Sequence, residues 1–125
     1  MIAGIGIDLI DVERVEERIA SGNGFRDYVF SPHEIEYCEA MAHKYQHYAA
    51  RFSAKEAFLK AMGTGWVGDI LFNEIEVRQE GAQKPEIILH GETLLVYNRL
   101  KLGKISLSLS HLKHVATAIV IIEQP

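Results

Sequence analysis

The chain has 125 residues, of which 48% are hydrophobic and 24% are charged. This is an ordinary globular composition and predicts one domain over residues 1–125. The net charge of −4 argues against broad nucleic-acid binding, and no apolar run approaches the roughly 20 residues of a membrane span, so we expect neither partner. The single cysteine, Cys38, cannot form an internal disulfide, and the N-terminus lacks the basic start of a signal peptide. We therefore expect a cytoplasmic protein with an unreactive buried thiol.

The N-terminal segment predicts a strand followed by a helix. Residues 1–7 are apolar without a helical period, which is typical of a buried strand. Asp8 then falls at the end of that strand, where a side chain is often presented to a site. Asp11 is a good N-cap for a helix over residues 12–20. Asp8 has an alternative interpretation as a turn residue or a cap.

Two further helices are predicted before the middle of the chain. Ser31, followed by proline and by Glu34 three positions on, forms a capping box for a helix that runs to about His43. No pattern assigns residues 25–30. A long central helix follows from about Tyr45 and ends at Gly63-Thr64-Gly65.

The central helix has apolar residues on more than one face, which predicts burial on several sides. Charged side chains lie among them: Arg51, Lys55, Glu56 and Lys60. Glu56 and Lys60 are four residues apart and therefore share a face. Their plainest interpretation is a solvated ion pair, since charged residues are rarely buried.

The second half of the chain predicts strands and one helix. Alternating or continuous apolar patterns predict strands at residues 70–72, 74–78, 85–90, 104–110 and 115–122, and a helix at residues 91–102. The second and third of these strands are expected to form a hairpin. The fold class is α+β, with an antiparallel sheet packed on the long central helix.

Two carboxylates have the chemistry of a magnesium site. Asp8 and Glu56 are hard oxygen donors, and Mg²⁺ is usually held by two carboxylates together with a substrate phosphate. If these two side chains converge, Lys60, one turn after Glu56, would stand beside the same phosphate as a positive charge. Sequence spacing alone does not establish that convergence.

The six histidines do not indicate zinc, because neither an HExxH motif nor a cysteine cluster accompanies them. His43 and His47, four residues apart, are expected to be helix-surface residues. His111 follows a cleanly alternating strand and is a candidate site residue at a strand end. Its alternative is a polar turn residue.

Three segments together resemble the holo-acyl-carrier-protein synthases, which are 4′-phosphopantetheinyl transferases. They are GIGIDLIDVERVE at Gly4–Glu16, RFSAKEAFLKAMGTG at Arg51–Gly65 and SLSH at Ser108–His111. LFNEIEV at Leu71–Val77 and QKP at Gln83–Pro85 fall where the family has comparable elements. The resemblance covers nearly the whole chain.

This resemblance implies transfer of the phosphopantetheine arm of coenzyme A to a serine of apo-acyl carrier protein in fatty-acid synthesis, releasing adenosine 3′,5′-bisphosphate. It implies that Asp8 and Glu56 are Mg²⁺ ligands and that Lys60 contacts the phosphate, these three being the catalytic residues. Charge neutralisation and positioning are what phosphoryl transfer requires. The base for the serine proton is either Glu56 or a Mg²⁺-bound water or hydroxide.

The resemblance also implies the remaining contacts. Arg51, Lys60, Lys84, Pro85 and His111 would bind coenzyme A, and the chain would form a homotrimer with active sites between subunits. On the helix over residues 12–20, the residues expected to bind the carrier protein are Arg14 and Arg18. Two other functions stay open at this point: an inactive relative that binds coenzyme A or a partner, and a structural α+β domain.

Overall fold

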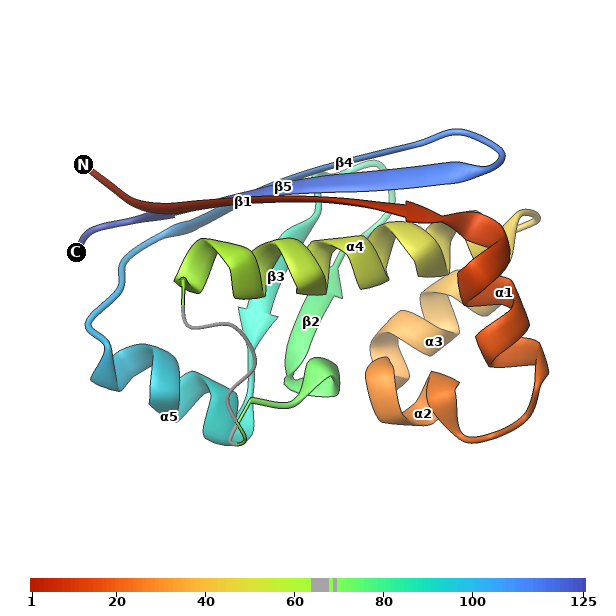
Figure 1. The fold of residues 1–125 in the computed structure, drawn as a ribbon, viewed down its shortest axis with the longest axis horizontal. Helices are drawn as coiled ribbons and strands as arrows, with labels where there is room; N and C mark the ends of the chain where they lie inside the picture. The colour runs from red at the N-terminus through yellow and green to blue at the C-terminus, as the bar shows by residue number, and fades with distance from the viewer. Residues whose placement is uncertain (64–67, 69) are drawn as a thin grey trace.

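Two antiparallel sheets form the β part of the fold. The computed structural model describes residues 1–63, 68 and 70–125. Its larger sheet has the strand order β1-β5-β4, and its smaller sheet is the hairpin β2-β3. The strands are β1 (Ile2–Asp11), β2 (Ile75–Arg78), β3 (Glu86–Leu89), β4 (Ile105–His111) and β5 (Val115–Glu123). The sheet of the C-terminal half thus takes its edge strand β1 from the N-terminus, and both termini lie at the same end of it (Figure 1).

The helices are α1 (Val12–Ala20), α2 (Phe25–Val29), α3 (Pro32–Glu39), α4 (Lys44–Met62) and α5 (Gly91–Arg99). The α+β class, the long central helix and the capping box at Ser31 are confirmed. Gly63 ends α4 in the left-handed conformation, as predicted, whereas Thr64 and Gly65 lie outside the described residues. No described helix is both long enough and apolar enough to cross a membrane.

Several boundaries differ from the predictions. The helix predicted to reach His43 ends at Glu39, and the α5 helix predicted to reach residue 102 ends at Arg99. The strand predicted at residues 70–72 is wrong, because the 3-10 helix η1 (Phe72–Glu74) begins there. Asp11 occupies the N-cap position of α1, but its side chain makes no capping hydrogen bond.

Helix α4 lies directly under the larger sheet and is covered on nearly all sides (Figure 1). Gly4 and Gly6 of β1 permit this close approach. A Cβ atom at Gly4 would lie 1.8 Å from the carbonyl oxygen of Ala61, and one at Gly6 would lie 1.9 Å from that of Ala57. Only glycine fits between this strand and this helix, so β1 and the helix backbone are held in one relative position.

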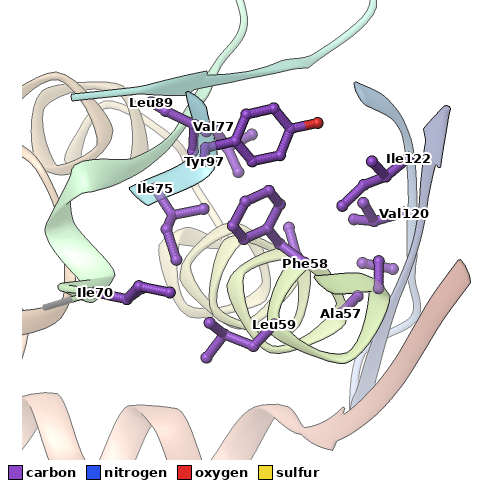
Figure 2. Close-up of a cluster of buried hydrophobic side chains, with 13 residues drawn as sticks. Ala57, Phe58, Leu59, Ile70, Ile75, Val77, Leu89, Tyr97, Val120 and Ile122 are labelled. Atoms are coloured by element: carbon purple, nitrogen blue, oxygen red, sulfur yellow. The ribbon is translucent and has the colours of Figure 1, made fainter. Parts of the chain in front are cut away.

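Two apolar clusters form the core, and α4 contributes to both. The first joins the C-terminal half of α4 to the hairpin, α5 and β5, with Phe58 stacked on Tyr97 at a centroid separation of 5.9 Å (Figure 2). The second joins the N-terminal half of α4 to α1, α2 and α3. Its member Cys38 is fully buried, and burial raises the pKa of the thiol to about 12, as expected for an unreactive cysteine.

A fully buried ion pair fastens α3 and the hairpin to α4. The Lys55 ammonium donates to Glu34 Oε1 at 2.8 Å and to the main-chain carbonyl oxygens of Phe72 and Ile75. Glu34 also accepts from the main-chain N–H of Ser31 at 2.8 Å and of Val77 at 2.7 Å. Each charge therefore meets several partners, which is the condition under which burial of charge is tolerated.

Candidate active site

Asp8 lies inside β1 rather than at its end. The predicted strand end at residue 7 is wrong, because Leu9 to Asp11 continue to pair with β5. The Asp8 side chain is on the α4 side of the sheet, where its carboxylate accepts hydrogen bonds from Ser53 Oγ at 3.0 Å and Lys60 Nζ at 3.3 Å. These two donors from α4 hold the carboxylate in place.

Glu56 and Lys60 come from the same face of α4, and the structure brings both to Asp8. Lys60 pairs with Asp8, not with Glu56, and it also donates to the carbonyl oxygen of Ile7 at 3.0 Å. The solvated Glu56–Lys60 ion pair considered from the sequence is absent among the described residues. The expected convergence of the three side chains is therefore present in the fold.

The Glu56 carboxylate is half-buried and accepts no hydrogen bond from a described residue. Burial and the negative charge of Asp8 raise the pKa of Glu56, whereas Lys60 and Arg18 lower it. Two carboxylates thus share one cavity, and that of Glu56 has no hydrogen bond or ion pair with a described residue. A divalent cation would relieve that repulsion, so the donor set fits one.

No cluster of three or more His, Cys, Asp or Glu side chains that could hold a metal occurs in the described ranges. Two carboxylates alone leave most coordination positions of an octahedral cation to water and substrate oxygens. That is how Mg²⁺ is commonly held in proteins, and it differs from a closed structural site.

A cavity of about 420 Å³ opens at these residues, and we call it the carboxylate cavity. It lies between β1, α1 and α4, and its lining includes Asp8 and Glu56 together with Arg14 and Arg18 of α1. Both arginines are exposed, and the Arg18 guanidinium lies 5.8 Å from the centroid of the Phe25 ring. The carboxylate cavity thus combines two arginines with the carboxylates of Asp8, Asp11 and Glu56.

The other predicted coenzyme A residues line a second cavity of about 420 Å³, which we call the arginine cavity. Its charged and imidazole-bearing lining consists of His47 and Arg51 from α4, Lys84 from the β2–β3 connection and His111 from the end of β4. The other polar or ring-bearing residues described in its lining are Tyr37, Gln79, Pro85 and Ser108.

Arg51 has a side chain that is only 2% exposed and incompletely satisfied. Its guanidinium lies 4.2 Å from the centroid of the Tyr37 ring, and it donates long bonds of 3.4 Å to the His47 carbonyl oxygen and to Gln79 Oε1. The buried Nε atom has no hydrogen-bond partner in the described part of the chain. A guanidinium in this state is ready to bind an anion.

The two cavities share no lining residue in the part of the chain that the structure describes. Arg51 and Glu56 are five positions apart on α4, which places them about 140° apart around the helix axis. One chain therefore presents the predicted metal ligands and most of the predicted nucleotide ligands as two separate half-sites.

Sequence reasoning missed two residues that position this site. The Ser53 hydroxyl donates a hydrogen bond that orients the Asp8 carboxylate, but the helical sequence around Ser53 gives no sign of this role. Glu34 was predicted only as a capping-box residue, although it is also the partner of Lys55. The buried charge at Lys55 was the one available signal, since a covered lysine requires a carboxylate somewhere in the fold.

Comparison with known proteins agrees with the fold and with the family predicted from the sequence. Residues 4–120 match the family model of the 4′-phosphopantetheinyl transferase superfamily, and the chain therefore belongs to that superfamily. Its relatives there include the holo-[acyl-carrier-protein] synthase of Cytophaga hutchinsonii, which is 46% identical, with 97% of each chain covered. That of Geobacter sulfurreducens is 43% identical, with 100% of each chain covered. Within the superfamily, the chain falls with these synthases.

Solved structures give the same result. The holo-[acyl-carrier-protein] synthase of Neisseria meningitidis has a TM-score of 0.90 and 30% identity, and the match covers 99% of this chain and 100% of that one. The synthase of Bacillus anthracis in complex with CoA (3′,5′-ADP) has a TM-score of 0.81 and 32% identity, covering 100% and 99%. The family predicted from the sequence is confirmed.

Proposed function

We propose that this protein transfers the 4′-phosphopantetheine group of coenzyme A to a serine of apo-acyl carrier protein in fatty-acid synthesis. The serine oxygen forms a bond to the β-phosphorus, the bond to the bridging pyrophosphate oxygen breaks, and adenosine 3′,5′-bisphosphate leaves. The observation that carries the proposal is that Asp8 and Glu56 line one cavity while Lys60 pairs with Asp8. The family membership supports the same reaction.

Asp8 and Glu56 would hold Mg²⁺, which supplies positive charge to the pyrophosphate and so stabilises the negative charge that develops on the leaving group. Lys60 contributes a further positive charge from the same face of α4, where its contact with Asp8 holds it. Glu56, which lines the same cavity as Asp8, is a candidate acceptor of the serine proton.

Arg51, Lys84, Pro85 and His111 would bind the nucleotide of coenzyme A in the arginine cavity. The incompletely satisfied guanidinium of Arg51 supports this role. Lys60, which lies outside that cavity, would contact the pyrophosphate instead. The separation of the two half-sites further implies that one subunit supplies the metal ligands and a neighbour supplies the nucleotide pocket.

A homotrimer, the assembly implied by the family resemblance, is part of this proposal. The outer face of the larger sheet carries an apolar stripe, with Ile5 56%, Ile7 63% and Leu9 69% exposed. Register places Ile7 opposite Ile119 of β5, which is 37% exposed on the same face. Exposed apolar patches of this kind mark association surfaces, and burial of this one would bring neighbouring half-sites together.

Arg14 and Arg18 would bind the carrier protein at the mouth of the carboxylate cavity. Acyl carrier proteins are acidic, so two exposed arginines beside the metal ligands are well placed to guide the serine inward. We place the protein in the cytoplasm as one transferase domain over residues 1–125. The shared contribution of α4 to both core clusters supports the single domain.

Mass spectrometry of apo-acyl carrier protein incubated with coenzyme A, Mg²⁺ and this protein tests the proposal. We expect the carrier to gain one phosphopantetheine group. Glu56→Gln is expected to abolish the gain, whereas Glu36→Gln, a matched change at an exposed glutamate of α3, is expected to leave it intact.

An unmodified carrier would refute the enzyme. Coenzyme A binding without transfer would then indicate an inactive binding relative, and no binding by calorimetry would indicate a structural domain. Transfer by Glu56→Gln at the wild-type rate would exclude Glu56 as a metal ligand.

A further inference from the structure

His47 lies in the arginine cavity, although the sequence predicted it to be a helix-surface residue like His43. His43 is exposed at the N-cap of α4 and does not line that cavity. One turn later, His47 is half-buried, with its ring 5.1 Å from the His111 ring and 6.0 Å from the Tyr37 ring between centroids. It therefore stands between α3 and β4, with Arg51 one turn further along its own helix.

The charge of the arginine cavity favours an anion. None of the described residues that line it carries a carboxylate, and the basic side chains in the lining are Arg51 and Lys84. The Nε atom of Arg51 is buried and lacks a partner within the described residues. His47 and His111 add two imidazoles that carry positive charge only when protonated.

The groups that act on His47 all disfavour its protonation before an anion arrives. Burial lowers the pKa of His47, as do the positive charges of Arg51, His111 and His43. The Tyr37 ring faces it from α3, and Lys84 of the β2–β3 connection adds positive charge to the same cavity. A phosphate group bound there would reverse this balance, because an opposite charge favours the protonated imidazole.

We propose that His47 is a further ligand for a phosphate group of the nucleotide and that it takes up a proton as the phosphate enters the arginine cavity. This inference rests on the proposed function, since the phosphate belongs to coenzyme A. The proton comes from solvent, and protonated His47 donates a charge-assisted hydrogen bond to the phosphate oxygen. Binding of coenzyme A is thereby coupled to pH.

The sign of the coupling follows from linkage. The bound state holds more protons than the free state, so affinity falls as pH rises. The contribution of His47 is fully present at low pH and is lost as pH rises through its pKa in the bound state. Loss of a hydrogen bond to a charged group predicts that His47→Gln weakens binding about tenfold at pH 6.5 and only slightly at pH 8.5.

Titration calorimetry with adenosine 3′,5′-bisphosphate tests this inference. Repeating the titration at pH 7.5 in buffers of different ionisation enthalpy gives the number of protons taken up on binding. We expect a net uptake by the wild-type protein that His47→Gln removes. His43→Gln replaces the other imidazole of the same helix face, outside the cavity, and is expected to retain the uptake.

Wild-type protein that transfers phosphopantetheine and binds the bisphosphate without proton uptake would refute the role of His47 alone. Uptake that persists in His47→Gln and disappears in His111→Gln would assign the proton to His111 and would equally overturn it. Wild-type protein that neither transfers nor binds would overturn the proposed function and this inference together. If His47→Gln fails to fold, the proton uptake measured for the wild-type protein still tests the inference.

Discussion

Replacing Lys55 by methionine is expected to lower the free energy of unfolding by about 3–5 kcal/mol. Lys55 is fully buried and donates to Glu34 and to two carbonyl oxygens. Methionine fills a similar volume, so the change leaves little cavity. The loss comes instead from the Glu34 carboxylate, which remains in the core with two N–H donors and no neutralising charge.

This loss is large without being disabling. Globular proteins are stabilised by roughly 0.05–0.15 kcal/mol per residue, which gives about 6–19 kcal/mol for this chain. We therefore expect Lys55→Met to fold at room temperature and to unfold at a much lower urea concentration. Urea titration followed by far-ultraviolet circular dichroism measures the difference, and an unchanged slope confirms that the same transition is being compared.

Glu34→Gln combined with Lys55→Met removes the uncompensated charge. The double variant is expected to recover about 1–2 kcal/mol relative to Lys55→Met alone. Lys44→Met is the matched control, because Lys44 lies on the same helix in a partly exposed pair with Glu39 and should cost less than about 1 kcal/mol. Equal losses of unfolding free energy for Lys55→Met and Lys44→Met would refute the reasoning. So would a double variant whose loss equals the sum of the losses measured for Glu34→Gln alone and Lys55→Met alone.

Three further predictions follow from the packing and charge of the site. Gly6→Ala is expected to cost about 3 kcal/mol in urea titration, because its Cβ would overlap the Ala57 carbonyl oxygen, whereas Gly68→Ala, with no described atom near its Cβ, should stay within about 0.5 kcal/mol. Glu56→Gln should raise the melting temperature of chelator-treated protein at pH 7 and not at pH 4. Because the pKa of Glu56 is raised in the folded protein, its favourable contribution to stability is present below its unfolded pKa and is lost as pH rises through its folded pKa. An equal change in melting temperature at both pH values would contradict this prediction. Ile7→Glu on the exposed sheet face should reduce the solution mass from a trimer to a single chain by light scattering and abolish transfer, and an unchanged mass would exclude this face as the interface.

The elements that local signals specify were predicted well. Helix α4 begins within one residue of its predicted start and ends at the predicted glycine, because strong helix formers are followed by a residue that adopts φ +74°. The capping box at Ser31 is present with both of its hydrogen bonds. The five-residue helix α2 escaped prediction because it is shorter than two turns and shows no usable period.

Errors occurred where tertiary contacts override local patterns. The polar Asp8 was expected to end the first strand, but Ser53 and Lys60 satisfy its carboxylate and allow the strand to continue beside β5. Helix α3 stops at Glu39 without a glycine or proline, and Glu39 accepts hydrogen bonds there from Lys44 and Tyr48 of the next helix. No periodicity encodes contacts of this kind.

The candidate site was predictable in composition but not in arrangement. Asp8 and Lys60 are 52 residues apart, and their meeting depends on the two glycines that let β1 rest on the backbone of α4. The family resemblance, rather than any spacing, indicated this convergence. His47 was set aside as a surface residue because its neighbours in the cavity depend on tertiary packing, with Tyr37 on the preceding helix α3 and His111 64 residues further along the chain on β4.

The nearly complete burial of α4 has a functional reason as well as a structural one. An ordinary surface helix presents one face to a site and the other to solvent, whereas α4 presents Glu56 to the carboxylate cavity and Arg51 to the arginine cavity. A rotation of the helix that improved one half-site would displace the other. The glycine contacts on one side and the Lys55–Glu34 pair on another prevent such rotation. A buried ion pair adds little net stability to a core. The Lys55–Glu34 pair instead fixes the rotation of α4, and with it the directions in which Glu56 and Arg51 point.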